Sequence, residues 1–135
     1  MTTNTEFQNV AEDLKWRGAL FDATPGAEHT LATEKITAYN GFDPTASSLH
    51  IGNLVAIMGL VRLQQYGHTP IALVGGGTGM IGDPSGRADE RTLLSVADID
   101  YNVEAIRAQL EPFLDFNAKS NPAKVVNNAD WLRTT

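Results

Sequence analysis

The sequence has 135 residues, of which 42% are hydrophobic, with a formal net charge of −6 and no cysteine. A chain of this length forms at most one domain with a modest core. The lack of cysteine excludes a disulfide framework and a thiolate metal site. The acidic balance argues against a polyanion-binding surface on this segment alone.

The first residues have neither the basic start nor the apolar run of a secretory signal. No apolar stretch approaches the roughly 18 residues that a membrane span requires, so we expect a cytoplasmic protein without membrane contacts. The first predicted element is a helix over 7–21. A loop over 22–28, which contains Pro25 and Gly26, follows it.

A short β-prone segment over 35–40 comes next, and Gly41 closes it. The turn at 43–48 supplies a serine as the N-cap of the following helix. We predict that helix over 49–66, with Gly67 as its C-cap signal. Because its apolar residues extend most of the way round, we expect it to be buried against a sheet.

The continuous apolar run at 70–75 is typical of a parallel strand covered on both faces. A glycine-rich loop follows, in which Pro84 prevents an immediate helix. We predict a further helix over 98–111, stopped by Pro112, and a last short strand over 124–127. Alternating strands and helices predict an α/β fold, a Rossmann-type parallel sheet with flanking helices.

The segment GFDPTASSLHIGN, from Gly41 to Asn53, is the most informative motif. It places a histidine and a glycine at a predicted helix N-terminus, where unpaired N–H groups favour phosphate. Gly52 has no Cβ and lets a ligand approach the backbone. His50 and Asn53 are three residues apart, so they share a helix face and can reach one ligand together.

The polar and charged residues in this motif and near it also have purely structural interpretations. A histidine such as His50 is more often solvated or packed, but its neighbours at nucleotide-site spacing favour the binding role. Tyr39, at a strand end, is equally consistent with a core position. Asp83 after a glycine loop more often braces that loop, and Arg87 and Arg91 are most simply part of a solvated, ion-paired face.

Residues 77–82 spell G-x-G-x-x-G after a predicted strand, which is the dinucleotide-binding fingerprint. That fingerprint requires a helix to begin within the loop. Asp83 and Pro84 break the chain just after the third glycine, and an aspartate there would repel a pyrophosphate. We therefore set the dinucleotide interpretation aside.

The motif at 41–53 resembles the His-x-Gly-His signature region of class I aminoacyl-tRNA synthetases. Together with TAYNGFDPT, GHTPIALVGGGTGMIGDPSG and NPAKVVNNADW, it closely resembles the N-terminal part of the bacterial tyrosyl-tRNA synthetases. The likeness extends from about Leu14 to Trp131. It implies an N-terminal helical segment over 1–34 and the first half of a class I synthetase catalytic domain over 35–135.

The resemblance implies a cytoplasmic homodimer that joins tyrosine to ATP and passes the tyrosyl group to tRNA(Tyr). The implied tyrosine site contains Tyr39, which would hydrogen-bond the phenol hydroxyl, Asp83, which would face the ammonium group, and Asn128. Magnesium would accompany ATP as part of the substrate, with no metal ligand in the protein.

The resemblance also implies an ATP site. Gly41 would lie beside the adenylate, the N–H of Asp43 would meet the α-phosphate, and Thr45 and His50 would hold the departing pyrophosphate. The implied catalytic groups are Thr45, His50, Asn53, Arg87 and Arg91, and the implied ATP-binding groups are Gly41, Asp43, Pro44, Thr45, His50, Gly52 and Asn53.

The sequence departs from this family pattern at two points. Asn53 replaces the second signature histidine, although its amide can still donate to a ribose. Asparagine at this position also occurs in the tryptophanyl relative. The second class I signature, a Lys-Met-Ser-Lys-Ser-like loop, is absent, so we expect a fragment or a truncated gene product, with the tRNA-binding part missing. Three alternatives stay open: another His-x-Gly-His nucleotidyltransferase, a tryptophanyl-type synthetase, and a non-catalytic remnant.

Overall fold

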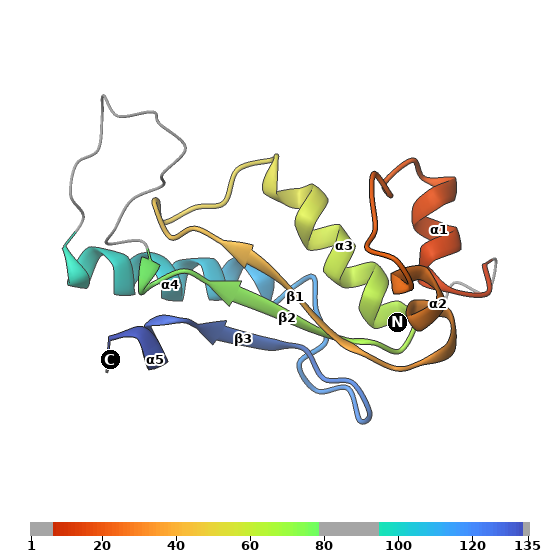
Figure 1. Ribbon diagram of the computed structural model, residues 1–135. Coiled ribbons are helices and arrows are strands. Elements are labelled where there is room, and N and C mark those ends of the chain that lie inside the picture. The colour runs from red at the N-terminus through yellow and green to blue at the C-terminus, as the bar shows by residue number, and fades with distance from the viewer. Residues whose placement is uncertain (1–6, 79–94, 134–135) are drawn as a thin grey trace.

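The computed structural model describes residues 7–78 and 95–133. Its centre is a sheet of three parallel strands in the order β1–β2–β3 (Figure 1). These are β1 (Thr37–Phe42), β2 (Thr69–Val74) and β3 (Lys124–Asn127). β2 pairs with β1 and β3 pairs with β2, both in parallel, so the predicted α/β parallel sheet is confirmed.

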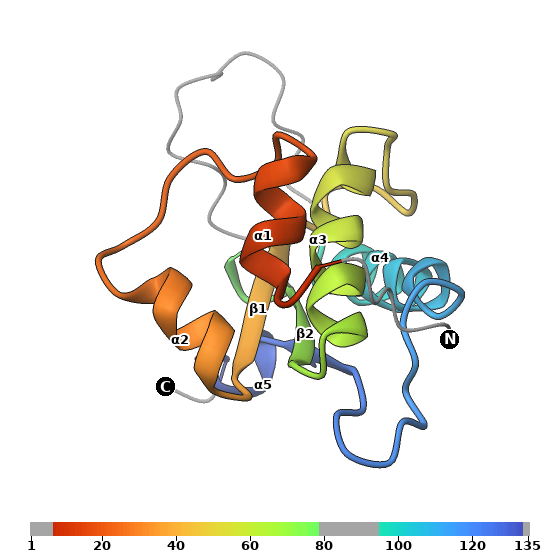
Figure 2. The same ribbon diagram turned by 90° about the vertical axis from the view of Figure 1, so that its right-hand side faces the viewer.

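Helices α3 (Asn53–Gln65) and α4 (Val96–Leu110) form the two crossovers. Crossovers between parallel strands are right-handed, and the two crossovers here, β1 to β2 and β2 to β3, move in the same direction across the sheet. Both helices therefore lie on the same face of the sheet. Figure 2 shows them on the same side of β1 and β2. The core fills this space and consists of Phe42, Ile57, Leu60, Val61, Ala72, Val74, Ile99, Val103, Ile106, Leu110, Leu114 and Ala123.

Helix α4 shows why this packing follows from sequence. Ile99, Val103, Ile106 and Leu110 recur at helical spacing, and all four are buried. Its N-terminus has a complete capping box, in which Ser95 Oγ accepts from Asp98 N–H and the Asp98 carboxylate accepts from Ser95 N–H. The helix is therefore fixed at its end and along one face.

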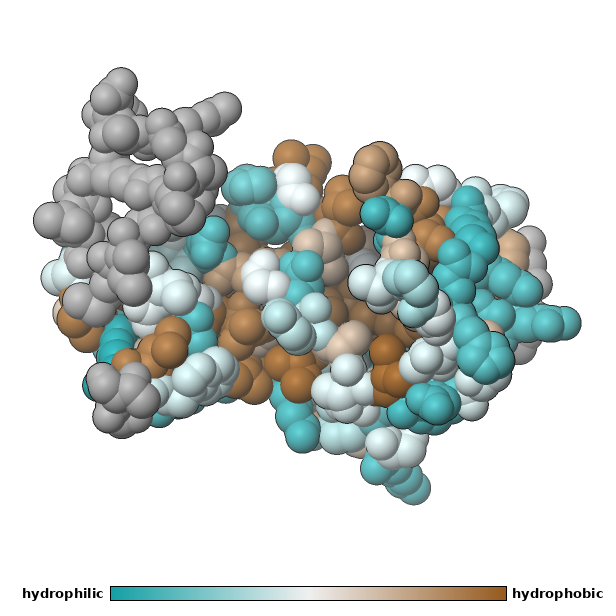
Figure 3. All heavy atoms as spheres, in the orientation of Figure 1, coloured by the Kyte–Doolittle hydropathy of each residue, from teal (hydrophilic) through white to brown (hydrophobic). Residues whose placement is uncertain are grey.

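The other face of the sheet carries apolar residues outside this core. In β2 the buried residues alternate with partly exposed ones, and Ile71 and Leu73 belong to the second set. Their register partners are Tyr39 in β1 and Val126 in β3, and Tyr39 is 70% exposed. Hydrophobic residues gather over the middle of this face in the space-filling view (Figure 3). We call it the open face.

Two short helices precede the sheet, α1 (Val10–Trp16) and α2 (Ala27–Thr33). A buried carboxylate, Asp13, fastens α1 to the end of α3. Its oxygens accept from Arg17 Nε and, at 2.9 Å, from the Tyr66 hydroxyl. Burial and the hydrogen bond to Asp13 raise the pKa of Tyr66 to about 12, so the hydroxyl keeps its proton. The proposed division between 1–34 and 35–135 stays a prediction.

Gln64 at the end of α3 holds the connection between α4 and β3. Its buried Nε2 donates to the carbonyls of Asp115 at 2.7 Å and Asn121 at 3.1 Å, and its Oε1 accepts from Asp115 N–H at 2.9 Å. Asn121 Nδ2 donates in return to the carbonyls of Gln64 and His68. An irregular segment thereby satisfies its backbone groups through side-chain amides.

The predicted element boundaries need several corrections. The first helix spans 10–16 rather than 7–21, because Gly18 adopts a φ of 68° and Ala19 N–H bonds to the Leu14 carbonyl, which ends the helix. Helix α2 lies partly in the predicted loop. Gly41 lies inside β1 and does not close it.

The predicted serine N-cap of α3, the first crossover helix, is also wrong. Helix α3 begins at Asn53, and its N-cap is Gly52. Residues 50–53 form a separate turn, in which Asn53 N–H bonds to the His50 carbonyl and His50 N–H bonds to Asn53 Oδ1, each at 3.0 Å. The predicted C-cap at Gly67 is confirmed, with a φ of 89°. The short helix α5 (Ala129–Leu132) was not predicted.

His68 supplies a pH-dependent contact next to β2. Its buried Nδ1 accepts from Ile36 N–H at 3.2 Å. Burial, together with the charge of Lys35, holds the pKa of His68 below its usual 6.5, although a backbone hydrogen bond at Leu31 opposes this. The folded state therefore binds this proton less readily than the unfolded chain does.

We predict that the free energy of unfolding falls as the pH is lowered through about 6.5 toward the lower pKa of folded His68, in part because the unfolded chain binds the His68 proton more readily. His68→Asn keeps an amide oxygen near Nδ1 but cannot titrate, so its acid loss should be smaller. Urea unfolding at several pH values measures this, with the exposed His29→Asn as control. Equal acid loss in wild type and His68→Asn would contradict the prediction.

Candidate active site at the carboxyl edge of the sheet

All three strands end at one edge of the sheet. Two backbone hydrogen bonds continue the pairing past the strands, from Gly75 N–H to the Phe42 carbonyl at 2.9 Å and from Asn128 N–H to the Val74 carbonyl at 3.0 Å. Ligands of open α/β sheets bind in the crevice beyond this edge. The segments after the three strands are therefore held side by side where a ligand is expected.

The segment after β1 begins in extended form. Tyr39, Gly41 and Asp43 are exposed, whereas Phe42 and Pro44 are buried, so residues 39–44 alternate between the open face and the core. A Cβ on Gly41 would meet no atom within 4 Å. The structure thus places Tyr39, Gly41 and Asp43 on one side, with free space over the Gly41 backbone.

Residues 43–52 form what we call the signature loop. Thr45 and His50 are both exposed on it. Gly52 is tightly placed, because a Cβ there would lie 2.9 Å from the ring atoms Cε1 and Nδ1 of His50. Any larger residue would push the His50 ring away. The loop therefore presents His50 close to the N-terminus of α3.

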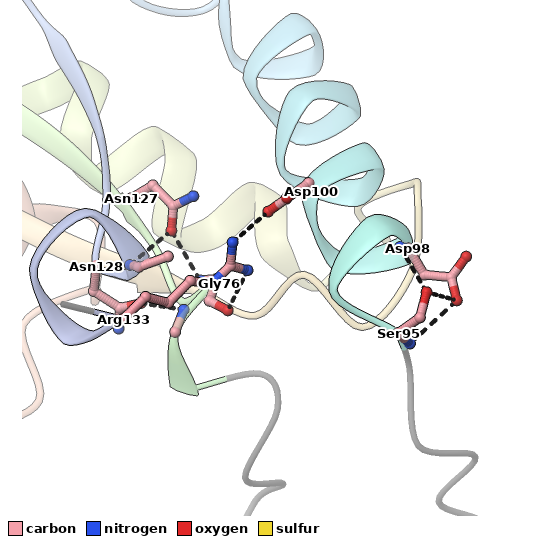
Figure 4. A network of polar contacts seen from close by, with 9 residues as sticks. Gly76, Ser95, Asp98, Asp100, Asn127, Asn128 and Arg133 are labelled. Carbon is pink, nitrogen blue, oxygen red and sulfur yellow. Dashed lines mark hydrogen bonds and ion pairs between the residues drawn. The ribbon is translucent and has the colours of Figure 1, made fainter. Parts of the chain in front are cut away.

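The segment after β2, Gly75–Thr78, is bound to the segment after β3 (Figure 4). Gly76 N–H donates to Asn127 Oδ1 at 3.2 Å, and Gly77 N–H donates to Asn128 Oδ1 at 2.7 Å. Asn128 Nδ2 also contacts Thr78 Oγ1 at 3.3 Å. Two adjacent amides therefore fix the path of the glycine segment.

Packing explains why small residues occupy this segment. A Cβ on Gly76 would lie 2.3 Å from Asn127 Oδ1, and one on Gly77 would lie 3.0 Å from the Leu132 Cβ. A Cβ on Gly75 would lie 2.8 Å from Thr78 Oγ1 and 3.6 Å from Asp43 Oδ1. Asp43 is thus next to the glycine segment, which joins the first two parts of the site.

Arg133 links this edge to α4. Its guanidinium pairs with Asp100 at 3.0 Å and reaches the Gly76 carbonyl at 3.4 Å, as Figure 4 shows. Sequence reasoning did not single out Asn127, Arg133 or Asp100. Their side chains gain a role only through partners that are distant in the chain, so no local motif indicates them.

The predicted tyrosine-site residue Asn128 is 8% exposed, with its amide bound to Gly77 and Thr78. Asp83, Arg87 and Arg91 lie outside the described residues. Within 7–78 and 95–133, no group of three or more His, Cys, Asp or Glu side chains could hold a metal ion. In the same ranges, no helix is long and apolar enough to cross a membrane.

A family profile described as "tRNA synthetases class I (W and Y)" matches residues 31–135. The chain belongs to this family. It is 60% identical over 126 residues to a tyrosine–tRNA ligase of Cytophaga hutchinsonii, an alignment that covers 93% of this chain and 30% of that relative. It is 54% identical over 123 residues to one of Roseiflexus castenholzii, covering 91% of this chain and 29% of the relative.

Solved structures agree on the fold of this chain. A C-terminally truncated mitochondrial tyrosyl-tRNA synthetase of Coccidioides posadasii superimposes with a TM-score of 0.73 at 24% identity, covering 97% of this chain and 38% of that one. The corresponding Aspergillus nidulans structure gives 0.72 at 22% identity, covering 97% and 40%. The predicted Rossmann-type class I catalytic fold is confirmed.

We predict that Gly76→Ala destabilises the folded chain. The new Cβ displaces Asn127 Oδ1, which accepts from Gly76 N–H and, at 3.0 Å, from Ala129 N–H. Loss of these bonds should cost about 1–3 kcal/mol in urea unfolding.

Gly59→Ala is the matched control, because its Cβ in α3 would meet nothing within 4 Å. That change should stabilise the chain by about 0.5–1 kcal/mol through helix propensity. Similar unfolding free energies for the two variants would show that Asn127 does not constrain Gly76.

Proposed function

We propose that this chain is the ATP- and tyrosine-binding part of a tyrosine–tRNA ligase. Such an enzyme activates tyrosine with ATP to tyrosyl-adenylate and pyrophosphate, then transfers tyrosine to tRNA(Tyr). The observation that carries the proposal is the 60% identity to a relative of that name over 93% of the chain. The chain spans about 30% of that relative's length, so the full reaction involves regions of the relative beyond this match.

The geometry supports an ATP site along the signature loop. A carboxylate oxygen of tyrosine would attack the α-phosphorus, and the bond to pyrophosphate would break. Free space over Gly41 suits the adenylate, and the Asp43 N–H would meet the α-phosphate. Thr45 and His50, both exposed, would bind the departing pyrophosphate, with Pro44, Gly52 and Asn53 shaping the loop.

This chemistry depends on placement and charge rather than on a protein nucleophile. Magnesium would enter bound to the ATP phosphates. Arg87 and Arg91 would add positive charge near the pyrophosphate. In this proposal, the rigid carboxyl edge of the sheet supplies the precision, because its loops are bonded to one another before any substrate arrives.

Tyrosine would lie over the open face. Tyr39 projects from β1 on that face, two residues before Gly41, so a phenol bonded to Tyr39 can direct its carboxylate toward the adenylate position. Asp83 would pair with the ammonium group. Asn128 would support this site through Gly77 and Thr78, whose positions it fixes.

Further partners follow from the same proposal. Transfer of the tyrosyl group requires tRNA(Tyr), bound through regions beyond this chain, and we propose a cytoplasmic homodimer. Tryptophan is the competing amino acid, because the matching family includes both specificities. The names of the relatives favour tyrosine over tryptophan and over another nucleotidyltransferase reaction.

The test is a fusion in which this chain replaces the matching 126-residue segment of the Cytophaga hutchinsonii ligase. We expect ATP–pyrophosphate exchange that depends on tyrosine and not on tryptophan. The parent ligase, assayed beside it, shows that the remaining segments are active. Exchange stimulated by tryptophan, or a folded fusion without exchange, would refute the proposal.

In the same fusion, His50→Ala should lower the adenylation rate constant by about 10²–10³-fold, because one charge-directed donor to the leaving group is lost. The affinity for tyrosine and ATP should change much less. Pre-steady-state pyrophosphate release gives the rate constant. A normal rate constant with weakened ATP binding would mean that His50 acts only in binding.

A further inference from the structure

Helix α4 contacts the backbone of the signature loop near the start of the loop, just after β1. Asn102 Nδ2 donates to the Pro44 carbonyl at 2.9 Å, and both residues are buried. Because a buried amide donor without a partner is costly, this bond fixes where the loop leaves β1. Thr45 follows immediately after Pro44.

A second residue of α4 binds the far end of the loop. Gln109 Oε1 accepts from Leu49 N–H at 2.8 Å, and its Nε2 donates to Ser48 Oγ at 3.1 Å. Both ends of the amide are used, so its orientation is set. Leu49 immediately precedes His50.

The space beside Gln109 explains why these bonds matter. A hollow of about 440 Å³ lies next to the loop, lined by Leu49, His50, Ile51 and Phe113 among others. Leu49 packs against the core, but the next residues, His50 and Ile51, border the hollow. The polar contacts of Gln109 therefore add to the packing of Leu49 in holding this end of the loop.

The spacing on α4 matches the loop. Asn102 and Gln109 are seven residues apart, which places them on one side of the helix about 10 Å apart along its axis. Their hydrogen bonds to Pro44 and Leu49 lie on either side of the exposed stretch that includes Thr45. The buried apolar row and capping box of α4 make that helix a fixed support.

We propose that Asn102 and Gln109 are positioning residues, which hold Thr45 and His50 in place for the leaving pyrophosphate. This inference rests on the proposed function for its chemistry, but the contacts themselves are independent of it. Neither residue touches substrate in this proposal. Each acts through the loop backbone.

The first experiment uses the 135-residue chain and measures amide hydrogen exchange. In Gln109→Leu, the Leu49 amide should exchange about 3–10-fold faster, the effect of losing one hydrogen bond, with the α3 amides unchanged. Gln109→Glu keeps the acceptor and should retain the wild-type rate. Gln65→Leu, a helix-surface amide paired with Arg62, is the matched control. Unchanged exchange at Leu49 in Gln109→Leu would overturn the proposal.

The second experiment uses the ligase fusion. Gln109→Leu should lower kcat for tyrosine-dependent exchange by about 10–100-fold with KM for tyrosine unchanged, since a shift of about 1 Å in a catalytic group has effects of this size. Gln109→Glu should restore the rate. Asn102→Asp, which sets an acceptor against the Pro44 carbonyl, should repeat the kcat loss independently.

The outcomes separate the two proposals. An inactive wild-type fusion refutes the proposed function, whereas the Leu49 amide still tests the contact. If the fusion is active and Gln109→Leu matches Gln65→Leu in kcat, the positioning role is refuted. If Gln109→Leu does not fold, Gln109→Glu and Asn102→Asp decide, and equal kcat in both refutes the proposal.

Discussion

Backbone pairing that continues past the strand ends is the constraint on which the rest of this structure depends. Gly75 N–H bonds to the Phe42 carbonyl and Asn128 N–H to the Val74 carbonyl, so three loops leave one edge at fixed separations. These bonds are among backbone groups and are independent of side-chain identity. They fix the positions at which the loops leave the sheet, and the residues of the loops then determine what can bind there.

Side-chain amides hold the irregular segments in place. Loops leave N–H and C=O groups without the regular partners of helix or sheet, and unpaired buried groups are costly. An asparagine or glutamine offers both a donor and an acceptor in one rigid plane. Asn127 and Asn128 serve the glycine segment in this way, and Gln64 serves the connection between α4 and β3.

The sequence predicted those features whose determinants lie close together in the chain, and it missed those that depend on distant residues. The strand at 124–127 and the glycine C-cap at Gly67 were predicted correctly, because apolar runs and C-cap glycines act through near neighbours. The start of α3 was missed, since the Asn53 amide closes a turn with His50 and delays the helix. The signature loop was found from its motif, whereas its supports were not.

Those supports illustrate the limit in physical terms. Gln109 lies 61 positions from its partner Ser48 and reads as an ordinary polar helix residue. Asn127 was noticed only as part of a strand, because its partner Gly76 is 51 positions away. Nothing in the residue type distinguishes such a side chain from a solvated one. Only the tertiary fold makes the pair.

The sheet order also bears on how the molecule assembles during synthesis. The strands lie in the sheet in the same order as in the chain, so each new strand pairs with one that has already been synthesised. Thr37 pairs with Thr69, and Ile71 then pairs with Lys124. The β1–α3–β2 unit closes the shorter loop and is expected to form first. Asn127 and Asn128 arrive with the last strand. The glycine segment therefore reaches the shape described here only after β3 and Asn128 have docked, so this edge of the three-stranded sheet is completed later than the β1–α3–β2 unit.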